Sequence, residues 1–224
     1  MPLAAVARAA RMSGPEFRAF QAARPDHERW ELIAGVPVMM TPPLMEHNVI
    51  ATNLQTLLNA ALRNHDESRY AVQRPGIEFP WPRTILAEME RNGAYRPEPD
   101  VAVVEYDDVV GGKRFTDRAY LLAEVVSSTD EDLTPVSGER WIDVKVRLHQ
   151  AHAPCEAIVV AEQERVHVTV HLRTAGGWTC RVLAGLDDEV AIPSAGLACP
   201  IADLYRDTRW HPRRARADRP RSPA

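Results

Sequence analysis

Two spacings of apolar residues recur along the chain, and each predicts a different kind of element. Apolar positions three and four apart over 46–63 are typical of an amphipathic helix, and a further helix is expected over 140–151. Ser13 and Glu16 form an S-x-x-E capping box, which predicts a short helix directly after it. A closing turn with one more short helix is expected over 194–205.

Runs of β-branched and other apolar residues predict the strands. The runs over 101–104 and 120–126 are typical of strands that are buried on both faces of a sheet. The run over 166–173 alternates apolar and polar residues, so one of its faces is expected to contact water. Four prolines make 80–99 an irregular segment, and 130–138 is expected to be a polar loop. Shorter strands are expected over 30–33, 36–40, 70–73, 77–79, 157–161 and 178–183.

The order of these elements defines the expected fold class. A helix, a hairpin and the long helix come first, a set of strands follows, and the last long helix precedes further strands. This order favours a mixed α/β (α+β) domain in which helices pack on a central mixed β-sheet.

Composition agrees with one globular domain. The 224 residues are 45% hydrophobic and 26% charged, and they contain neither an apolar run long enough to span a membrane nor a secretory signal. Three scattered cysteines argue against a disulfide scaffold or a structural zinc site. No P-loop, G-x-S-x-G or G-x-G-x-x-G motif occurs, so no nucleotide cofactor is expected. We expect a cytoplasmic protein without a membrane partner.

The charge is unevenly distributed, which suggests where the domain begins and ends. Six arginines and one aspartate give residues 208–224 a charge of +5. Because the whole chain has a net charge of −4, residues 1–207 carry a charge of −9. We therefore expect an N-terminal extension over 1–12, one domain over 13–207 and a basic, disordered tail over 208–224. The tail is either a solvated end or an arm that attracts phosphate groups. The acidic body argues against a permanent clamp for duplex DNA unless divalent cations fill an acidic pocket.

Two acidic residues in or next to the buried strands are candidates for chemistry. Glu124 interrupts the apolar run over 120–126, and Asp100 directly precedes the run over 101–104. Burying ionised carboxylates without partners costs several kcal/mol, and two neighbouring ones repel each other unless a cation lies between them. Mg²⁺ is the usual cation for such oxygen ligands. The alternative is that each carboxylate caps a backbone amide at a strand end.

Lys145 is the third candidate. It is one of two lysines in a chain with 27 basic residues, and it lies on the helix that follows Glu124. An ammonium group can orient an attacking water or stabilise a charged phosphate. The alternative is a solvated position on the helix surface.

Five segments of the chain together form a recognisable pattern. In order, they are Glu31-Leu32-Ile33-x-Gly35, Pro42-Pro43 with His47, Arg96-Pro97-x-Pro99-Asp100-Val101, Ala123-Glu124-Val125-Val126-Ser127, and Lys145-Val146-Arg147-Leu148. In this order they resemble the Uma-type restriction endonuclease family of the PD-(D/E)xK nuclease superfamily, and the resemblance extends from about Ser13 to Tyr205.

The resemblance implies a restriction-endonuclease-like core with a metal-dependent phosphodiesterase site. Asp100 and Glu124 would hold Mg²⁺ or Mn²⁺, and Glu31 would complete the metal shell or bind its water. Superfamily members usually carry the catalytic lysine two positions after the glutamate, where this chain has Val126. In the Uma-type pattern the following helix supplies it, which matches Lys145. His47 matches a family histidine whose role the pattern does not define.

Two departures from the family pattern concern the segment between Glu124 and Lys145. It spans 21 positions, which is longer than usual, and its acidic residues at 130–132 would repel a phosphate backbone or gate the pocket. His149 stands where the family commonly has tyrosine. The other histidines carry little signal, so that the pairs His149/His152 and His167/His171 are expected to be exposed.

The leading hypothesis is a Mg²⁺- or Mn²⁺-dependent endonuclease that hydrolyses DNA, with Asp100, Glu124, Lys145 and Glu31 as the catalytic residues. One alternative is a catalytically inactive protein of the same fold that binds nucleic acid or a partner chain. Another is an enzyme that acts on a small phosphodiester. By analogy with superfamily nucleases, a homodimer is expected, with the polar strand face around His167 as a possible interface.

Overall fold

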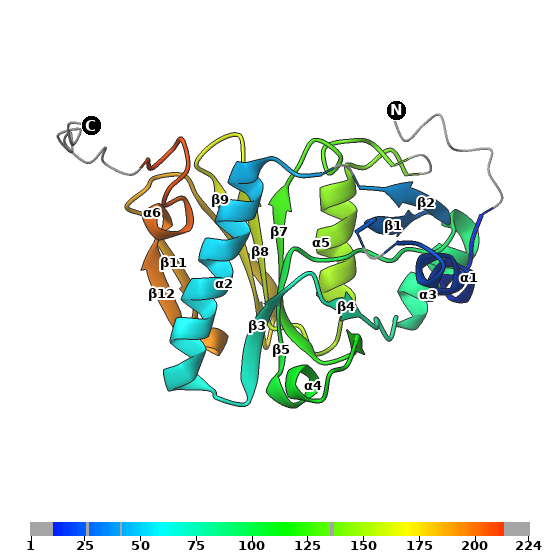
Figure 1. The fold of residues 1–224 in the computed structure, drawn as a ribbon, viewed down its shortest axis with the longest axis horizontal. Helices are drawn as coiled ribbons and strands as arrows, with labels where there is room; N and C mark the ends of the chain where they lie inside the picture. The colour runs from blue at the N-terminus through cyan, green and yellow to red at the C-terminus, as the bar shows by residue number, and fades with distance from the viewer. Residues whose placement is uncertain (1–10, 26, 41, 135–136, 213–224) are drawn as a thin grey trace, which may run out of the picture.

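A mixed β-sheet forms the centre of the molecule in the computed structural model, which describes residues 11–25, 27–40, 42–134 and 137–212. Its strands are β3 (Arg69–Gln73), β5 (Val101–Glu105), β7 (Ala119–Val126), β8 (Ala157–Glu162), β9 (Val168–Thr174) and β10 (Gly177–Leu183). They lie in the order β10-β9-β8-β7-β5-β3, and β7 and β8 are the parallel pair among antiparallel neighbours (Figure 1).

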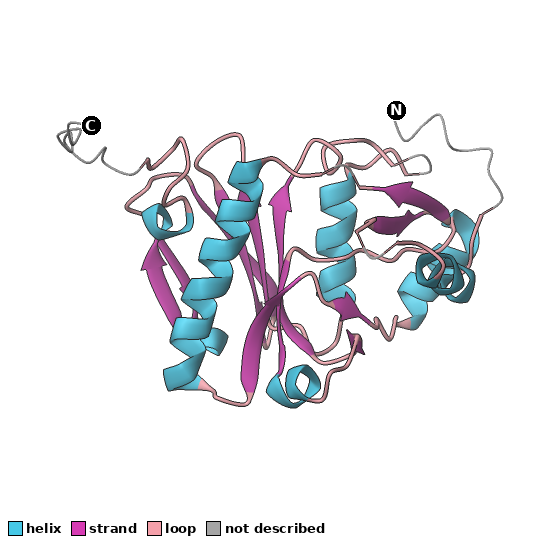
Figure 2. Ribbon diagram, viewed as in Figure 1, coloured by secondary structure: helices cyan, strands magenta, loops and turns pink. Residues whose placement is uncertain are grey.

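Two helices cover opposite faces of this sheet because residues on one strand alternate between the faces. Helix α2 (Met45–His65) packs through Ile50, Leu54 and Leu58 on one face of β5, β7 and β8. Helix α5 (Trp141–Ala151) contributes Ile142 to the core on the other face. Both helices run along the central strands in Figure 2. The middle strands β5 and β7 are therefore buried on both sides, as the sequence predicts.

A smaller layer lies beside α5 (Figure 1). It contains α1 (Gly14–Ala22), the hairpin of β1 (Trp30–Ile33) and β2 (Val36–Met39), and α3 (Arg83–Asn92). The predicted capping box is present, since the Ser13 hydroxyl accepts from the Glu16 backbone N–H and the Glu16 carboxylate accepts from the Ser13 backbone N–H. The hairpin turns at Ala34 and Gly35, whose φ angles of 51° and 76° are the left-handed values that tight hairpin turns require.

The remaining strands form two small sheets separate from the central one. β11 (Glu189–Ile192) and β12 (Leu197–Pro200) form a hairpin interrupted by a 3-10 turn (Pro193–Ala195), and α6 (Ile201–Leu204) follows; this unit packs against α2. In the second small sheet, β4 (Gly76–Ile77) pairs with β6 (Phe115–Thr116); α4 (Tyr106–Val110) follows β5.

The expected mixed α/β class is confirmed, and two local expectations were wrong. The segment 80–99 contains helix α3, because its prolines lie outside the stretch from Arg83 to Asn92 and Gly93 ends the helix with a φ of 92°. The segment before the short helix α6 contains the β11–β12 hairpin rather than a turn alone. Its alternation of apolar and polar residues is only a few positions long, which is too short to stand out from the sequence.

The predicted domain bounds at residues 13 and 207 stay predictions. Most of the expected extension over 1–12 and most of the basic tail lie outside the described residues. Where the tail begins, Arg209 forms an ion pair with Glu46 on α2, and the Trp210 indole donates a 3.0 Å hydrogen bond to the Gln163 carbonyl. Among the described residues, no helix has the length and apolar character needed to cross a bilayer.

The pair His149 and His152, which we expected to be exposed, is fully buried at the end of α5. Helix α5 lies against β7 and β8, so the face that carries these residues is covered. His152 packs with its edge against the Phe79 ring, 5.3 Å between centroids, and neither of its nitrogens has a hydrogen-bond partner among the described residues. On β9, His167 and His171 are partly exposed, and the expected homodimer through this face stays a prediction.

His152 should make the protein less stable in mild acid. Burial lowers its pKa from the ordinary 6.5 to about 4. The unfolded chain therefore takes up a proton between these pH values while the folded chain does not, so stability is lost as the pH falls from 6.5 to 4. The loss attributable to His152 is about 3 kcal/mol. Urea unfolding at pH 7 and pH 4.5 should show a smaller acid-induced loss for His152→Leu than for the wild type, and an equal loss would contradict this assignment.

Candidate active site

The two acidic residues singled out in the sequence lie side by side at one end of the sheet. In the β5–β7 ladder Val101 pairs with Ala123, and continuing this antiparallel register by one residue places Asp100 opposite Glu124. The Asp100 backbone N–H donates to the Ala123 carbonyl at 3.0 Å, and the Val125 N–H donates to Asp100 Oδ2 at 2.9 Å. Directly opposed residues have Cβ atoms about 5 Å apart. Strand pairing therefore sets the positions of both residues, and the Val125 N–H also orients the Asp100 carboxylate.

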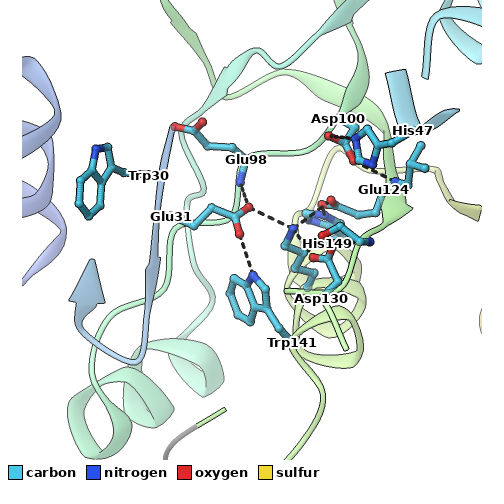
Figure 3. A network of polar contacts seen from close by, with 12 residues as sticks. Trp30, Glu31, His47, Glu98, Asp100, Glu124, Asp130, Trp141 and His149 are labelled. Atoms are coloured by element: carbon cyan, nitrogen blue, oxygen red, sulfur yellow. Dashed lines mark hydrogen bonds and ion pairs between the residues drawn. The ribbon is translucent and has the colours of Figure 1, made fainter. Parts of the chain in front are cut away.

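Helix α5 brings Lys145 to the same place. Lys145 follows Trp141 by one turn, which puts it on the buried face of the helix rather than in solvent. Its side chain is 3% exposed, and Nζ lies 3.1 Å from Glu31 Oε1, 3.1 Å from Glu124 Oε2 and 2.9 Å from Asp130 Oδ1. Figure 3 shows the three carboxylates converging from different parts of the chain. We call Lys145 with Glu31, Glu124 and Asp130 the Lys145 cluster.

Glu31 reaches the Lys145 cluster from β1. Because neighbouring residues of a strand point to opposite sides, Trp30 points away from the site and Glu31 points into it (Figure 3). The Trp141 indole donates to Glu31 Oε2 at 2.7 Å, and the Glu98 backbone N–H donates to Oε1 at 2.9 Å. These donors hold the carboxylate in one orientation.

His47 lies in the first turn of α2 and contacts the neighbouring acid. Its Nε2 is 3.0 Å from Asp100 Oδ1, and its Nδ1 has no partner among the described residues. Burial acts to raise the pKa of Asp100, but the hydrogen bond and charge of His47, together with the Lys145 charge, outweigh it and hold that pKa below its usual value. Asp100 is thus an ionised carboxylate with both oxygens oriented.

Glu124 is the most enclosed acid of the site, at 1% exposure. Its Oε2 faces Lys145, and its Oε1 lies 2.8 Å from Nε2 of His149. Burial raises the pKa of Glu124 well above its ordinary value; Lys145 opposes the rise, and Asp100, Glu31 and Asp130 add to it. Burial and the Lys145 charge lower the pKa of His149 well below its ordinary value, so that this imidazole stays neutral.

The Lys145 ammonium is held in its charged form. Burial alone would lower its pKa, but Asp130, Glu124 and Glu31 surround it and raise the pKa well above the ordinary value. One ammonium nevertheless offsets only part of the negative charge of these three acids and Asp100. The site therefore carries an excess of buried negative charge that a cation would relieve.

A cavity of about 230 Å³ opens over these residues. It is lined by Asp100, Glu31, Asp130 and Lys145. Glu124 is not among its lining residues. Its rim comes from the loop before α2 and from the segment after β7, through residues that include Pro42, Pro43, Leu44, Ser127, Ser128 and Thr129.

The structure adds Asp130 to the candidates. We expected it in a solvated acidic loop, but it is buried, and its Oδ2 accepts from the backbone N–H and the hydroxyl of Ser127 at 2.8 and 2.6 Å. The three-residue spacing from Ser127 to Asp130 was the available signal, since such polar pairs close local turns. Its neighbour Glu131 is exposed and pairs with Arg140 at 3.3 Å, as expected of a surface acid. Trp141 was missed because nothing in its local sequence distinguishes it from a core residue, and His149 was noted only as a departure from the family pattern and was wrongly expected to be exposed.

Carboxylate oxygens of this kind are the donors that hard divalent cations prefer. In the described ranges no three His, Cys, Asp or Glu side chains form a ready-made metal site. Asp100 and Glu124 are the pair whose position and charge fit an ion, and the remaining positions around it would be filled by water or phosphate oxygens, as is usual for Mg²⁺.

Comparison with known families identifies the class to which this fold and site belong. The model of the Uma2 family, described as "Putative restriction endonuclease", matches residues 15–202. The chain therefore belongs to the Uma2 family, which confirms the resemblance found in the sequence.

A solved structure shares the fold. It is the crystal structure of a "putative nuclease belonging to DUF820" from Anabaena variabilis ATCC 29413, with a TM-score of 0.59 at 15% sequence identity. The similarity covers 83% of this chain and 94% of that one. No curated protein matches the chain.

Proposed function

We propose that this protein is a divalent-metal-dependent endonuclease that hydrolyses phosphodiester bonds in DNA. One observation carries the proposal. Asp100 lies on the strand next to that of Glu124, and Glu124 contacts Lys145. Asp100 and Lys145 both line the open cavity. Membership of the Uma2 family supports the same reaction class.

Asp100 and Glu124 would hold the ion. The chemistry that Mg²⁺ or Mn²⁺ supplies when bound is a water of lowered pKa and a polarised scissile phosphate. Burial is the main cause of the raised pKa of Glu124, and the neighbouring acids Asp100, Glu31 and Asp130 add to it; a divalent cation at this position would favour the ionised carboxylate.

The chain's own residues orient and balance the charges. His47 and the Val125 N–H fix both oxygens of Asp100, and His149 fixes one oxygen of Glu124. Lys145, held protonated by its neighbours, lines the cavity and can stabilise negative charge that develops on the phosphoryl oxygens. Glu31 also lines the cavity and, oriented by Trp141, is placed to accept a hydrogen bond from an attacking water.

A specific observation favours the alternative of a catalytically inactive, nucleic-acid-binding protein. Glu124 does not reach the cavity, and both of its oxygens already contact Lys145 and His149. For catalysis, Glu124 has to share an oxygen between Lys145 and the ion, which the second lone pair of a carboxylate oxygen permits.

Two measurements distinguish these functions. Incubation of supercoiled plasmid with Mg²⁺ or Mn²⁺ should give nicked or linear DNA, and a chelator should stop the reaction. Calorimetric titration with Mn²⁺ should show saturable binding that Asp100→Ala removes. An inactive protein would show neither result, and hydrolysis of a small model phosphodiester without cleavage of plasmid or single-stranded DNA would indicate a different substrate.

A further inference from the structure

A second cavity adjoins the active-site cavity and is bordered by arginines. Its volume is about 460 Å³, and Glu98 lines both cavities, so the two lie on either side of that residue. Arg18 on α1, Arg74 after β3 and Arg114 before β6 line the second cavity. Arg29 lines the first. These arginines come from four separate segments of the chain, which the fold brings together beside the Lys145 cluster.

Three of these arginines have no carboxylate within ion-pair distance. Among the residues that the structure describes, Arg29, Arg74 and Arg114 form no direct ion pair, and Arg29 and Arg74 interact with Glu98 only at longer range. Surface arginines elsewhere in the molecule are often paired, as Arg140 is with Asp143 at 2.9 Å and Arg209 is with Glu46. Unpaired guanidinium groups can therefore bind an incoming anion without breaking an existing ion pair.

Arg74 joins the arginine-lined cavity to the catalytic acids. Its backbone N–H donates to the Asp100 carbonyl at 3.0 Å, and its guanidinium donates to Asn48 Oδ1 at 3.1 Å. Its φ of 51° lies in the left-handed region, which costs a residue with a side chain about 1 kcal/mol. The bond to Asp100 holds this conformation and fixes where the side chain of Arg74 starts.

Carboxylates in and next to the second cavity offset only part of its positive charge; Glu98 lines the cavity and Glu78 does not. Glu78 pairs with both Arg18 and Arg96, the latter at 3.1 Å, and so leaves one of these two charges uncompensated. Glu98 is the other acid, and burial and the neighbouring Glu31 raise its pKa. We call the surface formed by the arginines that line the two cavities the groove. Its positive charge is local, because the whole chain has a net charge of −4.

We infer that this groove, lined by Arg18, Arg29, Arg74 and Arg114, binds the phosphate backbone of the DNA strand that enters the active site. Guanidinium groups suit phosphate because their planar donors match two of its oxygens at once. Arg29, which lines the cavity with Asp100, and Arg74, whose backbone binds Asp100, contact the phosphates next to the scissile bond, and Arg114, which lines only the second cavity, contacts a phosphate farther along. The inference rests on DNA being the substrate, as proposed above, and it explains how an acidic domain attracts a polyanion.

The test is DNA binding by the full chain under conditions that do not allow cleavage. Fluorescence anisotropy with a labelled DNA duplex in Ca²⁺ compares the wild type with Arg74→Gln/Arg114→Gln. Both side chains are exposed, so the fold should tolerate the change, and Arg114→Gln alone serves if the pair does not fold. The matched control is Arg63→Gln/Arg181→Gln, which removes the same charge at exposed positions in the last turn of α2 and on the edge strand β10.

The groove variant should bind DNA roughly 10-fold more weakly, and the slope of log K against log salt should fall by about 2, one contact per lost arginine. The control variant should keep wild-type affinity and slope. Equal losses in both variants, or none in either, would overturn the inference.

The outcomes for the groove and for the nuclease separate clearly. If the groove variant binds and cleaves DNA as the wild type does, the inference about the groove is wrong, and the proposal of a nuclease is supported. If the wild type binds DNA through the groove but never cleaves it, the groove is correct and the nuclease proposal fails. A wild type that does not bind DNA contradicts both.

Discussion

Replacing Asp100 by asparagine is expected to slow DNA cleavage at least about 100-fold while the protein stays folded. Asparagine keeps an oxygen for the Val125 N–H and an amide group that can contact His47, so the local hydrogen bonds survive. It lacks the negative charge that a divalent cation needs. The measurement is the rate of plasmid nicking together with the urea unfolding midpoint.

Asp107→Asn provides the matched control for this change. Asp107 is exposed on α4, at the end of β5 opposite Asp100 (Figure 1). Its substitution should leave both the cleavage rate and the unfolding midpoint at wild-type values. Asp100→Asn that cleaves at the control rate would show that Asp100 takes no part in the reaction.

Lys145→Met is expected to destabilise the fold by about 3–5 kcal/mol at pH 7.5, since it leaves buried carboxylates without their counter-charge. The destabilisation should depend on pH. Burial and the neighbouring acids already raise the pKa of Glu124 well above its ordinary value, and loss of the ammonium, which opposes this rise, raises it further. The variant is therefore most stable at low pH, where Glu124 is protonated, and loses that stability as the pH rises. Urea unfolding at pH 5 and pH 7.5 measures both effects.

Lys113→Met is the control, because Lys113 is the other lysine of the chain. Its side chain is 56% exposed and pairs with Asp108 at 2.6 Å, so its loss should cost less than about 1 kcal/mol. If Lys145→Met costs as little as Lys113→Met and shows no greater loss at pH 7.5, then Lys145 does not neutralise the acids around it.

The sequence predicts those parts of the fold that depend on local patterns. The capping box at Ser13, the apolar spacing along α2 and the β-branched runs of β5 and β7 each determine an element from neighbouring residues. Helix α3 was not predicted, because four prolines in 80–99 indicate an irregular segment. Their positions, however, leave ten consecutive residues that form the helix.

The candidate site divides in the same way. Asp100 and Glu124 stand out because a charge in a buried strand needs a reason, Lys145 because it is one of two lysines and follows Glu124 on a helix, and the family resemblance adds Glu31. The burial of Asp130 and His149 was not predicted. Asp130 is buried because its loop folds back on Lys145, and His149 is buried because α5 packs on β7. Such contacts join residues that are distant in sequence, so no local pattern reports them.

The central claim is that Asp100 and Glu124 bind one divalent cation beside Lys145. The most direct test is a crystal soaked in Mn²⁺ and measured for anomalous scattering. We expect an anomalous peak within coordination distance of both carboxylates, and we expect it to be absent from Asp100→Asn crystals soaked in the same way. No peak at this position, with Mn²⁺ bound elsewhere or not at all, would contradict it.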